Sequence, residues 1–157
     1  QLKIWIMKIK SFFFFLISLF TLSSCVNELE PYDNPFIYLS SKGASSASVS
    51  QIAQVAGEYT IHLSSKTLTE PLVIDYSITA GDGLTEGVDY RIITQGRQAT
   101  IQPGLFEYNI RIMWLPHKLD ATKDNTLTIK LESNSLNFTM GLPGPDSLQK
   151  ELVIRKY

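Results

Sequence analysis

The segment Glu107-Tyr-Asn-Ile-Arg-Ile-Met-Trp-Leu115 alternates apolar and polar side chains along most of its length. Successive side chains of an extended strand point to opposite faces, so this alternation predicts a β-strand with one buried face. The expected buried face carries Tyr108, Ile110, Ile112 and Trp114, and the expected outer face carries Glu107, Asn109 and Arg111. We therefore expect a hydrophobic core on one side of this strand.

The same period of two recurs on both sides of that segment, between turns rich in Gly, Pro, Asn, Asp and Ser. The expected inward residues are Tyr59, Ile61 and Leu63, then Leu72, Ile74, Tyr76 and Ile78, then Leu127, Ile129 and Leu131. Further candidate strands are residues 36–40, 47–55, 90–93, 99–102 and 152–156. No segment carries a helical stripe, so we predict an all-β, Ig-like antiparallel Greek-key β-sandwich.

The first residues have the order of a secretory signal, in which basic residues precede a short apolar run. Lys8 and Lys10 precede the apolar residues 12–22, a run too short to cross a bilayer, which takes about 20 apolar residues. The run closes with Leu22, Ser23, Ser24 and Cys25, which resemble a bacterial lipobox. That resemblance implies a signal peptide over residues 1–24 and a lipid on Cys25.

Three segments of the chain follow from this assignment. Residues 1–6 precede Met7, which is followed directly by Lys-Ile-Lys, so we interpret them as upstream sequence read in frame. Residues 25–35 contain acids and prolines and suit a tether between lipid and domain. Residues 36–157 form the β-sandwich domain. The acids Glu28, Glu30 and Asp33 resemble an export signal to the outer face, so we expect a lipid-anchored, surface-exposed outer-membrane protein.

Charge and cysteine content exclude several classes of function. Removing three lysines with the leader from 14 basic residues leaves 11 against 15 acidic residues, a formal charge of −4. Nucleic-acid binding needs a basic stripe, which is missing here. The single cysteine is Cys25, so the domain holds no disulfide, zinc-thiolate site or cysteine nucleophile. We expect no cofactor.

Five segments of the domain together resemble the Calx-beta family in order and spacing. They are Leu72-Val-Ile-Asp-Tyr-Ser-Ile-Thr79, Thr85-Glu-Gly-Val-Asp-Tyr90, Ala99-Thr-Ile-Gln-Pro-Gly104, Tyr108-Asn-Ile-Arg-Ile112 and Leu127-Thr-Ile-Lys-Leu131. We expect Gly87 to permit an unusual turn, Tyr90 to bury its ring and Pro103-Gly104 to form a type II turn. The resemblance implies a Calx-beta-like sandwich.

Residues 34–157 also resemble the Calx-beta-like or Ig-like domain of Bacteroidetes cell-envelope lipoproteins, a family largely of unknown function. The opening Asn34-Pro-Phe-Ile-Tyr38 and the loop Gly141-Leu-Pro-Gly-Pro-Asp146 carry this likeness. Such proteins are often encoded beside glycan-uptake systems. The resemblance implies a non-catalytic binding or spacer module, with a polysaccharide or an envelope protein as its partner.

Calcium binding is an alternative function, because some Calx-beta domains bind calcium through clustered carboxylates. Calcium takes six to eight oxygen ligands. One loop offers Asp82, Glu86 and Asp89, and a second offers Asp120 and Asp124 but is diluted by lysines. The competing interpretation is that these acids are solvated and that Asp89 bonds its own backbone. We assign no metal ligands, and Asp82, Glu86 and Asp89 stay an alternative.

Glycan binding would use exposed rings, and the candidate ligand contacts are Trp114 and Phe138. Trp114 lies close to a loop, although its position in the alternation groups it with the core. Catalysis has no comparable signal, because His62 and His117 lack any neighbouring nucleophile motif. We therefore predict that the protein is not an enzyme. A purely structural or protein-binding domain is the remaining alternative.

Overall fold

The computed structural model describes residues 34–157, which fold into ten β-strands joined by loops, with no helix in this range. The predicted signal peptide, the lipobox with Cys25 and the tether up to residue 33 lie outside the described residues. Within the described range, no helix long and apolar enough to cross a membrane is found.

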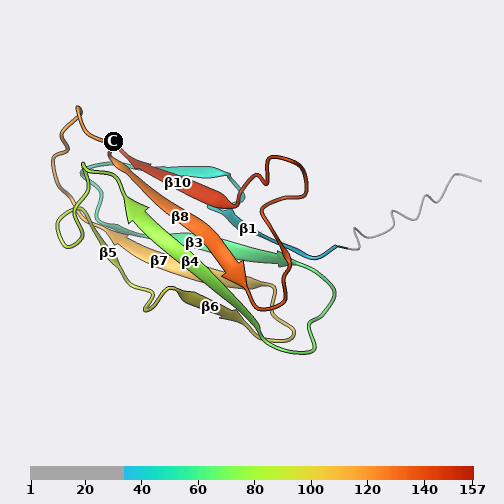
Figure 1. The fold of residues 1–157 in the computed structure, drawn as a ribbon. Coiled ribbons are helices and arrows are strands. Elements are labelled where there is room, and N and C mark those ends of the chain that lie inside the picture. The colour runs from blue at the N-terminus through green and yellow to red at the C-terminus, as the bar shows by residue number, and fades with distance from the viewer. Residues whose placement is uncertain (1–33) are drawn as a thin grey trace, which may run out of the picture. The chain divides into compact units, whose positions relative to one another are not determined.

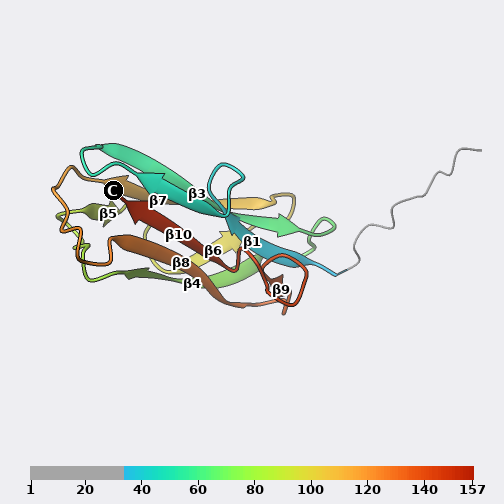
Figure 2. The same ribbon diagram turned by 90° about the horizontal axis from the view of Figure 1, so that it is seen from above.

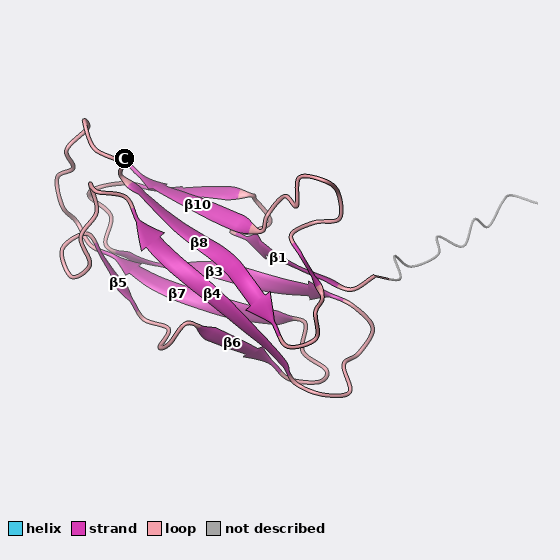
Figure 3. Cartoon of the chain, in the orientation of Figure 1, coloured by secondary structure: helices cyan, strands magenta, loops and turns pink. Residues whose placement is uncertain are grey.

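Two five-stranded sheets pack face to face, with strand orders β5-β7-β3-β1-β9 and β2-β10-β8-β4-β6. Figure 1 and the view from above in Figure 2 show the two layers, and Figure 3 shows that strands and loops account for all of the described chain. The strands are β1 (Phe36–Ser40), β2 (Ser46–Val49), β3 (Val55–Ser64), β4 (Leu72–Ala80), β5 (Tyr90–Ile92), β6 (Gln98–Ile101), β7 (Glu107–Trp114), β8 (Thr126–Asn134), β9 (Thr139–Met140) and β10 (Glu151–Lys156). The predicted all-β sandwich is confirmed.

The core lies between the sheets and is built from the alternating residues. Ile110, Ile112 and Trp114 of β7 are fully buried. Burying one of these isoleucine side chains contributes about 1.5–3 kcal/mol. The indole Nε1–H of Trp114 donates a hydrogen bond of 2.8 Å to the hydroxyl of Tyr59, so its one polar atom is satisfied inside the core. Burial raises the pKa of Tyr59, against the opposing effect of this hydrogen bond.

Both special turns expected from the sequence are present. Gly87 has a φ of 88°, and so has Gly104, in the range that side chains other than glycine rarely adopt. The amide of Leu105 donates to the carbonyl of Gln102 at 2.9 Å, which closes the turn around Pro103 and Gly104. This turn carries the chain from β6 in one sheet to β7 in the other.

Three features differ from the sequence prediction. Residues 47–55 are not one strand, because the amide of Ala53 bonds the carbonyl of Ser50 and closes a turn between β2 and β3. The short strand β9 was not predicted. Six strand pairs are antiparallel, but β1 pairs with β9 and β10 pairs with β2 in parallel. Parallel neighbours need crossover connections, which short-range alternation does not reveal.

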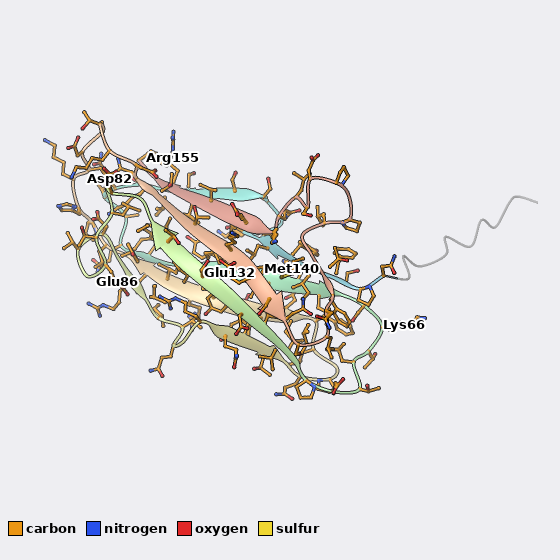
Figure 4. All side chains as sticks on the ribbon, viewed as in Figure 1. Lys66, Asp82, Glu86, Glu132, Met140 and Arg155 are labelled. Atoms are coloured by element: carbon orange, nitrogen blue, oxygen red, sulfur yellow. The ribbon has the colours of Figure 1, made fainter. Side chains whose placement is uncertain are left out.

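The register of the strands sorts the loops to two ends of the sandwich. The chain enters β1 at the end where Phe36 pairs with Ser64. At the opposite end, Trp114 pairs with Val55, and Lys156 pairs with Val49. We call that second end the loop end, made of residues 50–54, 81–89, 115–125 and Tyr157. Figure 4 shows Asp82 and Arg155 at the loop end and Lys66 at the other end.

Candidate functional site

A buried ion pair holds the loop end together. Lys156 occupies an inward position of β10, after the buried Leu152 and Ile154, and its side chain is 0% exposed. Its ammonium donates to Oδ1 of Asp89 at 2.9 Å, and the Asp89 side chain is only 2% exposed. Because β10 belongs to one sheet and Asp89 directly precedes β5 of the other, this contact joins the two sheets.

The ion pair is enclosed by further hydrogen bonds. Lys156 Nζ also donates to the carbonyl oxygens of Leu115 at 2.9 Å and of Asp89 at 3.3 Å, so all three of its donors are used. The Asp89 carboxylate accepts the amide of Thr85 at 2.9 Å and lies 3.0 Å from Nδ1 of His117. Burial alone would raise the pKa of Asp89, but the hydrogen bonds from Lys156, Thr85 and His117, with the charge of Lys156, hold it below its usual value.

The carboxylates considered for calcium do not converge on one point. Asp89 is neutralised by Lys156, whereas Asp82 and Glu86 are exposed. Oδ1 of Asp82 accepts the amide of Asp124 at 2.9 Å, which ties the 81–89 loop to the 115–125 loop. Between residues 34 and 157, no group of three or more His, Cys, Asp or Glu side chains is arranged to hold a metal ion. Asp82 and Asp89 therefore bond to other residues of the loop end and are not arranged around a metal ion.

Gln51 divides the surface of the loop end into two hollows. Its carbonyl accepts the amide of His117 at 2.9 Å, and its Oε1 accepts the amide of Leu119 at 3.0 Å. On one side lies a hollow of about 320 Å³, which we call the polar hollow. Its lining is Gln51, Leu119, Ala121, Lys123, Asp124, Asn125, Arg155, Lys156 and Tyr157. On the other side, a mainly apolar hollow is lined by Gln51, Ile52, Pro116, His117 and Lys118.

The polar hollow combines an exposed ring with hydrogen-bonding groups. Tyr157 is 64% exposed, and Arg155 and Lys123 are also exposed. A flat ring that keeps contact with water packs well against a partly apolar ligand, while nearby polar groups fix the ligand's orientation. Of the two hollows at the loop end, only the polar hollow is lined by an exposed tyrosine, phenylalanine or tryptophan ring.

The two aromatic residues that the sequence suggested as ligand contacts lie elsewhere. Trp114 is 0% exposed and bonds Tyr59 inside the core, so it cannot contact a ligand on the surface of this fold. Phe138 lies between β8 and β9, is half-buried against the core, and bonds Asn134 through its amide and carbonyl. Lys156 was not predicted from the sequence, although the inward positions of Leu152 and Ile154 put it on the core face. Arg155 and Tyr157 were not predicted either.

The outer face of β1, β3 and β7 carries a row of Ser40, His62 and Glu107. Ser40 Oγ lies 2.7 Å from Nε2 of His62, and Nδ1 of His62 lies 3.2 Å from Oε1 of Glu107. This order resembles a hydrolase triad. However, Ser40 is only 2% exposed, and the ring of Tyr38 stacks on His62 with 4.8 Å between centroids. A substrate has no approach to the Ser40 hydroxyl, so the row is a cross-strand network.

Comparison with known proteins supports the fold. No family model matches the sequence, and no curated protein matches it. Among solved structures, the chain is similar to CBD12 from CALX1.2, a Calx-beta domain structure, with a TM-score of 0.52 and 15% sequence identity. The match covers 77% of this chain and 44% of that chain. This likeness shows that the protein has a Calx-beta-like β-sandwich fold.

Proposed function

We propose that this protein is a non-catalytic, lipid-anchored module of the cell envelope that binds glycans in the polar hollow. The observation that carries the proposal is the hollow itself, which is lined by the exposed ring of Tyr157 together with the exposed side chains of Arg155 and Lys123. A sugar offers an apolar ring face and a rim of hydroxyl groups. In the hollow, the Tyr157 ring can pack on the apolar face, and the charged side chains can hydrogen-bond to the hydroxyl groups.

The size of the polar hollow suits a short part of a polysaccharide. Small-ligand sites range from about 300 to 1,000 Å³, and the polar hollow of about 320 Å³ lies at the lower limit. Roughly one or two sugar rings would fill such a space, with the remaining chain extending over the loops. A module of this kind captures a long polymer without enclosing it.

The place of the hollow also suits a protein held by lipid at Cys25. The chain enters β1 at the end opposite to the loop end. Residues 26–34, if fully extended, would reach about 30 Å. With the lipid in the outer membrane, the loop end would therefore be free to face away from the bilayer. Two or more acyl chains on Cys25 would give stable anchoring.

Calcium binding is less well supported than glycan binding. The similar Calx-beta structure makes it a reasonable alternative, but Asp82, Glu86 and Asp89 are separated, and the buried charge of Asp89 is already met by Lys156. A calcium module would gain thermal stability in millimolar calcium by mass action. A spacer would respond neither to calcium nor to glycans.

The test is retention of the full chain, in detergent, on gels that contain a panel of plant and host polysaccharides. We expect retention on at least one polymer, and we expect Tyr157→Ala to abolish it. Phe106→Ala is a matched control, because Phe106 is 41% exposed and precedes β7 at the opposite end. The proposal would be overturned if no polymer retained the wild type. It would also be overturned if Tyr157→Ala were retained as strongly as the wild type.

A further inference from the structure

We infer that the glycan bound in the polar hollow carries carboxylate groups, as polymers of uronic acids do. This inference rests on the proposed function of that hollow. The charge of the ligand is indicated by Arg155 and by the residues that surround it in the sheet.

Arg155 has no acidic partner. It points outward from β10, and its neighbours across the sheet are Ser48 on β2 and Thr126 on β8, both uncharged. No ion pair or hydrogen bond of its guanidinium is found within residues 34–157. A guanidinium presents its donors as a planar fork that fits both oxygens of a carboxylate. Arg155 is therefore ready to bind an anion.

The acidic side chains near the polar hollow accept hydrogen bonds from residues close to them in the chain. Oδ1 of Asp124 accepts the amide of Thr126 at 3.1 Å and its hydroxyl at 2.7 Å. Oδ1 of Asp120 accepts the hydroxyl and amide of Thr122, and these bonds, with the nearby charge of Lys123, lower the pKa of Asp120. The charge of Lys156 is met by Asp89. With Lys156 paired to Asp89, the lining holds two further positive charges, Lys123 and Arg155, against the one carboxylate of Asp124, so it keeps a net positive charge.

Arg155 and Tyr157 are spaced to act on the same ligand. Arg155 lies on β10 and Tyr157 directly follows the strand, and the amide of Tyr157 still bonds the carbonyl of Val49 on β2, so the alternation continues past the inward Lys156 and puts both side chains on the same side. Two residues of a strand span about 7 Å. A sugar ring packed on Tyr157 would place a carboxylate of that ring, or of the next one, within reach of the guanidinium.

The decisive experiment compares each acidic polymer with its own neutral form. The full chain, in detergent, is titrated with polygalacturonate, alginate and hyaluronan, and with the same polymers after methyl esterification of their carboxylates. We expect at least one acidic polymer to bind about tenfold or more tightly than its ester, with an affinity that falls as salt is raised. Arg155→Gln should remove this preference, and Arg91→Gln, an exposed arginine on β5, should not.

The outcomes separate the inference from the function on which it rests. Equal binding of an acid polymer and its ester, or an unchanged preference in Arg155→Gln, would overturn the inference while glycan binding stands. Binding only of neutral polymers in the wider panel would do the same. If no polymer binds in a manner that depends on Tyr157, the proposed function fails as well. An unchanged melting temperature of Arg155→Gln shows that the variant is folded.

Discussion

The ammonium of Lys156 lies 2.9 Å from a carboxylate oxygen of Asp89, and both side chains are shut off from water. The pair joins β10 of one sheet to the loop that precedes β5 of the other. Moving two charges out of water is unfavourable, and only close pairing with complete hydrogen bonding offsets it. The loop end, and with it the polar hollow, therefore depends on this contact.

Lys156→Met should destabilise the protein strongly, because it keeps the stem of the side chain but leaves the Asp89 carboxylate buried without its cation. Breaking one side of a buried pair costs about 3–5 kcal/mol. The free energy of unfolding, measured in urea, checks this value. Val153→Met, an exposed position on the same strand, should change it by less than about 0.5 kcal/mol. Similar midpoints for wild type and Lys156→Met would disprove the role given to the pair.

Acid should remove the stability that Asp89 provides. The pKa of Asp89 is lowered in the folded protein, so the unfolded chain binds the proton more readily. This contribution is complete above the unfolded value of about 3.9 and is lost as the pH falls through the lower folded value. Urea unfolding between pH 2 and 7 should show a decline beginning near pH 4.

Asp89→Asn is the control for that pH dependence. It should be less stable at pH 7 and should show a shallower decline in acid. Hydrogen bonds from Ser133 to Asp75 and from Thr122 to Asp120 also lower the pKa of these two exposed carboxyls, so part of the pH dependence should remain without Asp89. An Asp89→Asn profile parallel to that of wild type would show that another group is responsible.

Gly87→Val should destabilise the domain through the backbone alone. The φ of Gly87 is 88°, and a Cβ placed there would meet no atom within 4 Å, so crowding plays no part. Holding a side-chain-bearing residue in such a conformation costs about 1–3 kcal/mol. Asparagine tolerates positive φ better than valine, so Gly87→Asn should lose less stability. Equal melting temperatures for both variants and wild type would contradict this turn.

Trp114→Phe should lower stability and leave glycan retention unchanged. The variant loses the 2.8 Å hydrogen bond to Tyr59 and leaves the Tyr59 hydroxyl buried without that donor, at a cost of about 1–3 kcal/mol. Retention on polysaccharide gels, measured below the melting temperature of the variant, separates the two effects. Loss of retention in a folded Trp114→Phe protein would indicate that Trp114 contacts the ligand.

Cys25→Ala should release the protein from the membrane fraction, because it removes the acceptor of the proposed lipid. Ser24→Ala keeps a small residue before the cysteine and should leave the protein membrane-bound. Fractionation of cells followed by detection of the protein in soluble and membrane pools checks both variants. Equal membrane recovery of Cys25→Ala would disprove the lipid anchor.

The alternation of side chains was enough to predict the sandwich and much of its core. Along β7 the inward faces of Ile110, Ile112 and Trp114 follow directly from their spacing. The same rule, applied to Leu152 and Ile154, puts Lys156 in the core as well. A charged residue at an inward position needs a buried partner, and that requirement points to Asp89 only once the fold is known.

The features that alternation did not predict depend on contacts between distant segments. Residues 47–55 read as one extended run, but Gln51 turns away to bond His117 and Leu119, which are far along the chain. The strand β9 has two residues, and its only strand partner is β1. The polar hollow gathers residues from three separate segments, and no local pattern records that they meet.

The pairing of β1 on both edges has a mechanical consequence. Five residues of β1 pair with β3 and two pair with β9, so β1 is not the outermost strand of its sheet. If lipid holds the chain at Cys25 while a polymer pulls at the loop end, the load runs along β1. The hydrogen bonds on both edges are then sheared together and do not open one by one. If the proposed anchor and ligand are correct, this arrangement would let a small domain without disulfides carry tension between a membrane and a moving polymer.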